Sequence, residues 1–335
     1  MRQDHGRPVL LRALALSVSA LLGTVIAFIL LSGAEALARG RGLSLFGAVW
    51  NPSAGKFGIL TMIQASLLLA LSSLALGWCL SLGCCCALNG LAPRWAARWL
   101  MGLLTLMTAV PTVVYGFAAV FLLVPLIRDG LGGTGFCWLT AGLLVALQGV
   151  PTMTFIMDGA VRSLAAETRL TATALGMSPL QHLSRVVLPL AGKGAAPLAG
   201  KGAVPLAGKG AAPLASRPLL SAAVLGLGRA VGDALLPTML AGNAIRFAHS
   251  PLDSMRTLTA HISLVLSSDI GGGEHLSLLL AGALLLAFCA AFSLLNLKLG
   301  RMCRPAVSEQ NAGRSAEADP PEIPGARRLA QGAKS

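Results

Sequence analysis

The stretch LLSAAVLGLGRAVGDALLPTMLAG, residues 219–242, reads as a membrane-spanning helix that contains two charged residues, Arg229 and Asp233. A charge at the centre of a bilayer costs at least about 2.5–3.5 kcal/mol, so such residues usually have a function. Four residues apart on a helix, the two side chains share a face and can pair. Arginine can also hold a phosphate or a carboxylate through two parallel hydrogen bonds. The stretch therefore predicts either anion recognition or an ion pair that holds two helices together.

The composition of the whole chain is that of an integral membrane protein. Of its 335 residues, 55% are hydrophobic and only 12% are charged, and the mean hydropathy is +0.75. A soluble domain has about 25% charged residues. A membrane span needs about 20 apolar residues, and the stretches that qualify are approximately 9–32, 58–91, 100–127, 136–157, 219–242 and 276–297. We therefore expect an all-α integral membrane protein with about six transmembrane helices.

Positive charge is distributed unevenly between the two sides of the membrane. The net charge is +13, and an even number of spans places both termini on the side that carries most of the 26 Lys and Arg residues. Loops rich in Lys and Arg stay in the cytoplasm, so both termini are expected there. The first apolar run is longer than the about 7–15 residues of a signal peptide, which favours an uncleaved first span. Nucleic-acid binding is not expected, because no soluble basic domain is present to carry it.

The segments outside the apolar runs differ in composition. Within a transmembrane domain of residues 9–303 they comprise an external segment rich in Gly and Ser at 33–57, a cytoplasmic loop at 158–189 and a low-complexity repeat at 189–216. Polar tails flank the domain at residues 1–8 and 304–335. The second tail has few large apolar residues to bury, so we expect it to be disordered.

The repeat at 189–216 has a period of eight residues, with PLAGKGAA as its first unit. Each unit holds one Leu together with Pro and two Gly, which break helices, so we expect a flexible, positively charged linker. The segment GAAPLAGKG (194–202) superficially resembles a phosphate-binding P-loop, but five residues separate its glycines and Gly follows Lys201. Cys84, Cys85 and Cys86 lack the C-x-x-C spacing of a metal site. Neither a nucleotide site nor a metal site is expected in this chain.

Residues 161–189 predict a helix, a turn and a second, short amphipathic helix. Leu and Val recur at roughly helical spacing on both sides of the turn, which Gly176 to Pro179 supply. Ser178 can cap a helix that starts at Pro179. Such an element is either a docking site for a cytoplasmic partner or a connector on the lipid surface, and the pattern leaves both open.

This loop resembles the coupling motif of ABC importer permeases. That motif is Glu-Ala-Ala, three residues, Gly, nine residues, Ile, one residue and Leu-Pro, and Gly176, Val186, Leu188 and Pro189 have its spacing. More specifically, the chain is similar to the permease subunit of the bacterial phosphate-specific ABC transporter. The matching stretches, in family order, are KFGIL (56–60), VPTVVYG (110–116), LVPLIR (123–128), PTM (151–153), LGLGRAVGD (225–233), GN (242–243) and RTLTA (256–260).

The resemblance implies a type I ABC importer permease fold in the bacterial inner membrane, with no enzymatic activity and no cofactor bound by this chain. The implied partners are a second permease subunit in a heterodimer, a cytoplasmic ATPase dimer that binds ATP and Mg, a periplasmic phosphate-binding protein and membrane lipid. The implied coupling residues are Gly176, Met177, Ser178, Pro179, Val186, Leu188 and Pro189. By the same resemblance, Arg229 faces the substrate path, and Asp233 pairs with Arg229 or with its equivalent across the subunit interface.

The chain departs from the family pattern in the coupling motif and in the charged pair. The Glu-Ala-Ala of the motif falls on residues 170–172, which are Leu-Thr-Ala, and Glu167 lies one turn earlier. Asp233 stands where the family usually has Glu. Alternative functions are transport of another oxyanion, such as sulfate or molybdate, proton-coupled transport with Asp233 as relay, and a scaffolding paralogue disabled by the repeat. Gln148 and Asn243, near span ends, either line a path or satisfy backbone groups.

Overall fold

The computed structural model describes residues 6–37, 46–189, 218–266 and 273–301. The octapeptide repeat, except its first residue Pro189, and the polar tail at 304–335 lie outside the described residues. Within them, the helices that are long and apolar enough to cross a membrane are Arg12–Glu35, Leu60–Leu91, Thr112–Leu131, Trp138–Ala166 and Ser277–Leu295. The expected all-α membrane fold is therefore confirmed.

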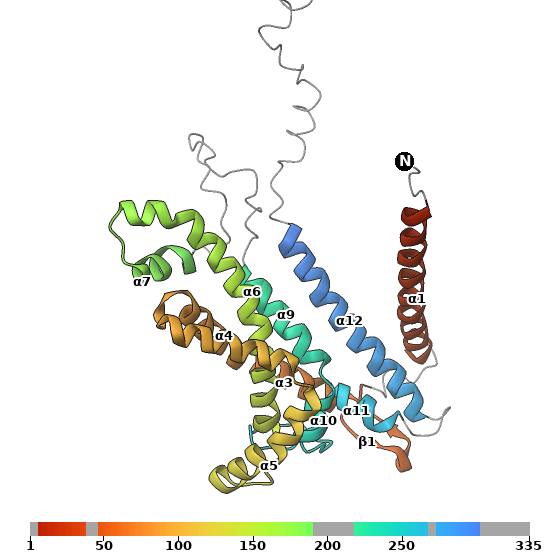
Figure 1. Cartoon of the computed structure of the whole chain (residues 1–335). Helices are drawn as coiled ribbons and strands as arrows, with labels where there is room; N and C mark the ends of the chain where they lie inside the picture. Colours follow the sequence, from red (N-terminus) through yellow and green to blue (C-terminus); the bar gives the residue numbers. More distant parts are fainter. Residues whose placement is uncertain (1–5, 38–45, 190–217, 267–272, 302–335) are drawn as a thin grey trace, which may run out of the picture.

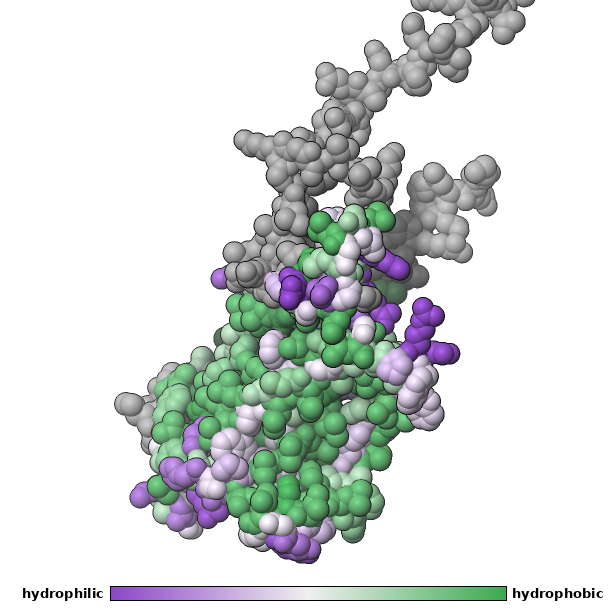
Figure 2. All heavy atoms as spheres, turned by 90° about the vertical axis from the view of Figure 1, so that its left-hand side faces the viewer, coloured by the Kyte–Doolittle hydropathy of each residue, from purple (hydrophilic) through white to green (hydrophobic). Residues whose placement is uncertain are grey.

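The long helices form a bundle whose two ends differ (Figure 1). They are α1 (Gly6–Ala36), α3 (Leu60–Cys86), α6 (Trp138–Ala174) and α12 (Gly273–Arg301). The beginning of α1, the end of α12 and the far end of α6 all lie at the upper end in Figure 1. On the face shown in Figure 2, apolar side chains cover most of the middle, and hydrophilic side chains gather toward the two ends. This distribution suits a molecule whose middle lies in hydrocarbon.

The third expected span, residues 100–127, is not one helix. It is divided into α4 (Arg94–Ala109) and α5 (Thr112–Leu131), with Val110 and Pro111 extended between them. A proline lacks the N–H that would bond the carbonyl four residues earlier. The carbonyl that Pro111 leaves free is that of Met107, and the hydroxyl of Tyr115 donates to it at 2.9 Å. The prediction of one continuous helix was wrong because hydropathy does not register a two-residue break.

The fifth expected span, residues 219–242, is also broken. The helix α9 (Pro218–Gly232) ends directly before Asp233, and α10 (Leu235–Leu240) begins two residues later. Pro237 cannot bond the carbonyl of Asp233, and the hydroxyl of Thr259 donates to that oxygen instead, at 2.8 Å. Broken helices at membrane depth are tolerated only where the freed backbone is buried in protein or lines a cavity. At both breaks the freed carbonyl is bonded by a side chain of the protein itself.

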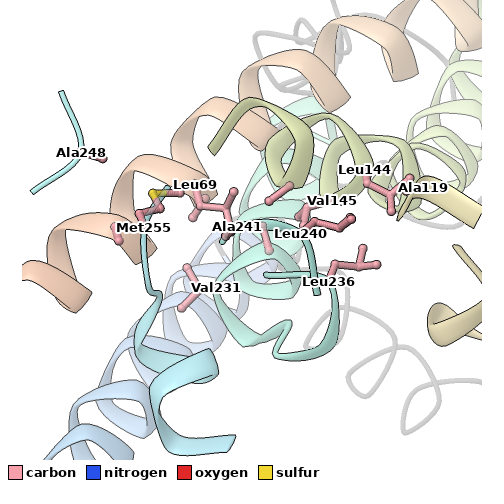
Figure 3. Close-up of a cluster of buried hydrophobic side chains, with 14 of the residues drawn as sticks. Leu69, Ala119, Leu144, Val145, Val231, Leu236, Leu240, Ala241, Ala248 and Met255 are labelled. Carbon is pink, nitrogen blue, oxygen red and sulfur yellow. The ribbon is translucent and has the colours of Figure 1, made fainter. Parts of the chain in front are cut away.

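The core of the bundle lies between α3, α6 and α9–α10. Figure 3 shows its main cluster, to which these elements contribute buried aliphatic side chains such as Leu69, Val145, Leu236 and Leu240. The helices α3 and α9 can approach α6 closely because small residues face Met153 of α6. A Cβ atom at Gly77 of α3 would lie 2.8 Å from Met153 Cε, and one at Gly226 of α9 would lie 2.5 Å from its Sδ.

The end of the bundle away from the loop after α6 carries a small subdomain. Two short strands, β1 (Trp50–Asn51) and β2 (Lys56–Phe57), form a hairpin around the 3₁₀ turn η2 (Pro52–Ala54). The short helix α11 (Leu258–Val265) packs in the same apolar cluster as the hairpin. The expected external segment at 33–57 thus contains regular structure in its described part, and α11 was not expected from the sequence.

Candidate functional site

Four polar side chains, from three helices and the break before α10, meet where the two broken helices approach α6. Thr112 is the first residue of α5, Gln148 lies on α6, Arg229 lies in the last turn of α9, and Asp233 stands at the break before α10. Thr112, Gln148 and Asp233 are half-buried, and Arg229 is exposed at the surface of this chain. We refer to these four residues as the polar cluster.

Gln148 is the centre of the polar cluster. Arginine has only hydrogen-bond donors and a carboxylate only acceptors, so the neighbours determine how the Gln148 carboxamide is oriented. Its nitrogen donates to Asp233 Oδ2 at 2.9 Å, and its oxygen accepts from Arg229 Nη2 at 3.2 Å and from Thr112 Oγ1 at 2.7 Å. The side chain of Gln148 thus bonds other polar side chains and not the backbone. That it lines a path stays a prediction.

Asp233 also organises the backbone at the break. Its Oδ1 accepts from the main-chain nitrogens of Leu235 at 3.1 Å and Leu236 at 3.4 Å, which caps α10. The carboxylate therefore uses Oδ1 for the cap and Oδ2 for Gln148. Together with the hydroxyl of Thr259 on its carbonyl, these contacts hold Asp233 in place.

Arg229 and Asp233 are close in sequence but do not form an ion pair in this chain. Among the described residues, the ion pairs within 4.0 Å include Arg128–Asp129, Arg162–Asp158 and Arg246–Asp253, but not this one. The expected direct contact is replaced by the indirect one through Gln148, because the helix ends between the two residues. Pairing across a subunit interface stays a prediction.

Of the two roles predicted for Asn243, lining a path or satisfying backbone groups, its contacts fit the second. Its side-chain nitrogen donates to the carbonyl of Thr238 at 2.7 Å, and its own carbonyl accepts from Arg256 Nε at 3.1 Å. It has a φ of 55°, a conformation that Asn tolerates better than most residues. Asn243 therefore closes the turn after α10 and satisfies backbone groups.

The loop after α6 has the predicted helix–turn–helix form. α6 runs without a gap to Ala174, and after the turn come α7 (Pro179–His182) and the π-helical turn η4 (Leu183–Val187), at the upper left of Figure 1. Gly176 has a φ of +67°, and its N–H bonds the carbonyl of Thr173 while that of Met177 bonds Ala172, both at 3.0 Å. These two bonds are a Schellman C-cap, which requires the left-handed residue that glycine supplies.

The predicted cap of the second helix is also present. Ser178 Oγ accepts from the main-chain nitrogen of Gln181 at 3.2 Å, and Gln181 Oε1 accepts from that of Ser178 at 3.1 Å. This reciprocal pair is a capping box. Farther on, Val187 is fully buried, whereas Val186 and Leu188 are half-buried and Pro189 is exposed. The backbone of Pro179 is described but its side chain is not, and the side chain of Glu167 is also outside the description.

The outer surface of this turn exposes large apolar side chains. Leu170, Leu175 and Leu180 are 82%, 72% and 51% exposed in this chain. Exposed apolar groups gathered in one place mark a contact surface with protein or membrane. We refer to these three leucines and the turn between them as the coupling turn.

An ion pair and a hydrogen bond that were not predicted from the sequence lie where α6 leaves the bundle. Asp158 is only 6% exposed, and its carboxylate lies 2.9 Å from Arg162 Nε. Asn89, in the π-helical turn η3 (Ala87–Leu91) after α3, donates to Asp158 Oδ1 at 2.7 Å. The spacing of Asp158 and Arg162 was the available signal, since side chains four residues apart on a helix can pair. Through these contacts of Asp158, the projecting part of α6 is held to the turn at the end of α3.

Outside the membrane-spanning helices, the groups whose pKa departs from its ordinary value lie at the end of the bundle away from the coupling turn. Burial lowers the pKa of His261 in α11 to about 4, and the nearby charge of Arg256 adds to this effect. Hydrogen bonds from the main-chain nitrogens of His249 and Ser250 lower the pKa of Asp253. Within the described part of the chain, no three His, Cys, Asp or Glu side chains gather as metal ligands would.

A bundle of apolar helices, with charges at a broken helix and an apolar turn projecting from one end, is typical of membrane transport proteins. Comparison with known proteins agrees with this class. Residues 80–211 match the family model described as the binding-protein-dependent transport system inner membrane component. The probable ABC transporter permease protein YqgH of Bacillus subtilis is 30% identical over 250 residues, which are 73% of each chain. The chain therefore belongs to this family of ABC transporter permeases.

Further relatives and one solved structure extend the comparison. The phosphate transport system permease protein PstC of Xylella fastidiosa (strain Temecula1) is 26% identical over 318 residues, 88% of this chain and 89% of that one. PstC of Haemophilus influenzae is 23% identical over 291 residues, 81% and 84% of the two chains. An inward-facing structure of the MetNI methionine ABC transporter matches 72% of this chain and 94% of its own, with a TM-score of 0.50 and 14% identity. The type I permease fold is thereby confirmed.

Proposed function

We propose that this chain is the inner-membrane permease subunit of an ATP-driven importer that translocates inorganic phosphate. The observation that carries the proposal is the guanidinium of Arg229, which lies at a helix break, is exposed on this chain and is not neutralised by a direct ion pair with a described carboxylate. Arginine binds phosphate through parallel hydrogen bonds. The names of the PstC relatives support phosphate as the anion.

The proposed partners follow from the family and from the coupling turn. A periplasmic binding protein delivers the anion, and a second permease subunit, in a heterodimer, completes the path beside Arg229. A cytoplasmic ATPase dimer, which holds ATP and Mg, docks on the coupling turn, where Leu170, Leu175 and Leu180 are exposed. Both termini lie on the cytoplasmic side in this proposal, because α1 begins and α12 ends at the same end of the bundle as the coupling turn (Figure 1).

The route of coupling is α6. The coupling turn directly continues this helix, and Gln148 on the same helix contacts both Arg229 and Asp233. From Gln148 to Ala174 the helix spans about 39 Å at 1.5 Å per residue. Movement of the coupling turn by the ATPase is thus delivered to the polar cluster by one element.

Phosphate uptake in cells that lack this chain tests the proposal. We expect the wild-type chain to restore ATP-dependent uptake, and Arg229→Gln to lower it at least about tenfold, since hydrogen bonds to charged groups contribute about 1.5–3 kcal/mol each. Arg128→Gln is the matched control, because Arg128 is exposed and pairs only with its exposed neighbour Asp129 among the described residues. Competition by excess sulfate or molybdate as strong as that by unlabelled phosphate would contradict phosphate as the substrate.

A further inference from the structure

The separation of Arg229 from Asp233 needs an explanation. The two residues are four apart, one is a cation and the other an anion, and in a medium of low dielectric constant their attraction is strong. They nevertheless form no ion pair in this chain, and the carboxamide of Gln148 lies between them. A neutral side chain from another helix thus occupies the place where the two charges would meet.

The contacts of Asp233 are complete without Arg229. One carboxylate oxygen accepts two main-chain N–H groups of α10, and the other accepts the amide nitrogen of Gln148. Arg229 has five N–H donors, of which Nη2 bonds Gln148. A direct, bidentate pair with Asp233 would use two of these donors and cancel the positive charge. Among the described residues, the observed arrangement leaves the positive charge of Arg229 and most of its N–H donors without a partner.

We propose that Gln148 is a positioning residue that keeps Arg229 from pairing with Asp233, so that the guanidinium stays available to the transported anion. The inference rests on the proposed function of Arg229. Gln148 suits this role because an amide offers an acceptor to Arg229 and a donor to Asp233 at the same time. Thr112 fixes the amide further, by donating to the same oxygen that Arg229 contacts.

The position of Gln148 on α6 makes this separation adjustable. Gln148 and the coupling turn belong to one helix, whereas Arg229 and Asp233 belong to the broken pair α9–α10. A shift of α6 relative to α9 withdraws the amide and allows Arg229 to close onto Asp233. The carboxylate then competes with the bound anion for the guanidinium, which releases the anion.

Suppression by a second substitution tests the inference in cells expressing the complete transporter. In Gln148→Leu the amide is absent, Arg229 pairs with Asp233, and phosphate uptake per amount of chain in the membrane is expected to fall at least tenfold. In Gln148→Leu/Asp233→Asn the competing charge is also absent, and uptake is expected to recover at least fivefold. Asn retains the cap of α10, because it caps helices as well as Asp. The Asp233→Asn single variant is the reference for the recovered level.

The outcomes separate this inference from the proposed function. Unchanged uptake in Gln148→Leu, or a double variant as inactive as Gln148→Leu although equally abundant in the membrane, would overturn the role of Gln148. Neither result would change the loss of phosphate uptake expected for Arg229→Gln, and that loss tests the proposed function itself. If Gln148→Leu does not accumulate, Gln148→Met, a closer match in shape, replaces it in both backgrounds and the same comparison decides.

Discussion

His261 is the residue whose environment departs most from its ordinary chemistry outside the membrane-spanning helices. Its side chain is fully buried, and among the described residues neither ring nitrogen has a hydrogen-bond partner. The ring packs edge-on against Trp50 of the hairpin, with 4.4 Å between centroids. Burial without a partner favours the neutral imidazole, which explains the depressed pKa. The hairpin and α11 therefore depend on an uncharged His261.

The stability of the protein should fall as the pH falls through the range in which His261 protonates. The ordinary pKa is 6.5 and the folded value is about 4, so between these values the unfolded state binds the proton and the folded state does not. The contribution of this residue is complete above pH 6.5 and decreases toward pH 4, by on the order of 3 kcal/mol. Thermal melting of the purified protein at about pH 7.5 and about pH 5 measures this decrease in stability.

The control for this prediction is His261→Leu, which removes the titrating group and keeps an apolar side chain. Its melting temperature should depend less on pH over the same interval. An equal pH dependence in both proteins would contradict the assignment to His261.

The two broken helices show how single prolines shape whole elements. Each break lies next to a carbonyl that proline cannot bond, and each freed carbonyl has a side-chain partner, Tyr115 Oη for Met107 and Thr259 Oγ1 for Asp233. Without these partners the carbonyls would be orphaned in an apolar surrounding. The breaks bring Thr112 and Asp233 to Gln148, so the cluster depends on them.

Thr259→Val should destabilise the protein, because it keeps the shape of the side chain and removes the donor to the Asp233 carbonyl. We expect a loss of about 1–3 kcal/mol, the cost of leaving a buried polar group unpaired. Thr61→Val is the matched control: Thr61 is 3% exposed, and its hydroxyl has no partner among the described residues. Its substitution should be neutral or stabilising. Equal effects of the two substitutions on denaturant or thermal unfolding would contradict the proposed role of Thr259.

Much of this architecture is readable from the sequence, and the reasons for the exceptions are physical. Composition predicts the spans, and Gly176 with Ser178 predicts the turn and its cap, because these depend on local chemistry. The breaks had a signal in Pro111 and Pro237, which averaged hydropathy obscures. The contacts of Gln148 with Arg229 and Asp233 had no such signal, because they join residues more than 80 positions apart through the packing of α6 on α9.

At the scale of the whole molecule, the coupling turn and the polar cluster are joined by α6 and not by the segment between the turn and α9. The sequence suggested that a flexible repeat separates the turn from the charged helix. The structure provides a continuous helix that bypasses this segment. The residues that flank the segment, Leu188 and Leu219, also belong to the same apolar cluster. The repeat is therefore not needed to connect them mechanically.

Deletion of residues 192–215, which lie outside the described part of the chain, should leave phosphate uptake within about twofold of wild type. The physical reason is that the contacts of the coupling turn and of Gln148 described above are all made with residues outside this segment, and that loop length alters stability only weakly. Uptake normalised to the amount of chain in the membrane measures the effect. A loss of uptake with normal membrane levels would assign the repeat a role in coupling.

The most direct test of the central claim is phosphate accumulation in proteoliposomes that contain the complete transporter, with ATP hydrolysis measured in the same sample. The account predicts that Arg229→Gln loses phosphate accumulation and retains ATP hydrolysis, because Arg229 meets the anion while the coupling turn on α6 is intact. Arg128→Gln should retain both activities. Phosphate accumulation by Arg229→Gln at the wild-type rate would contradict the claim that Arg229 recognises the transported anion.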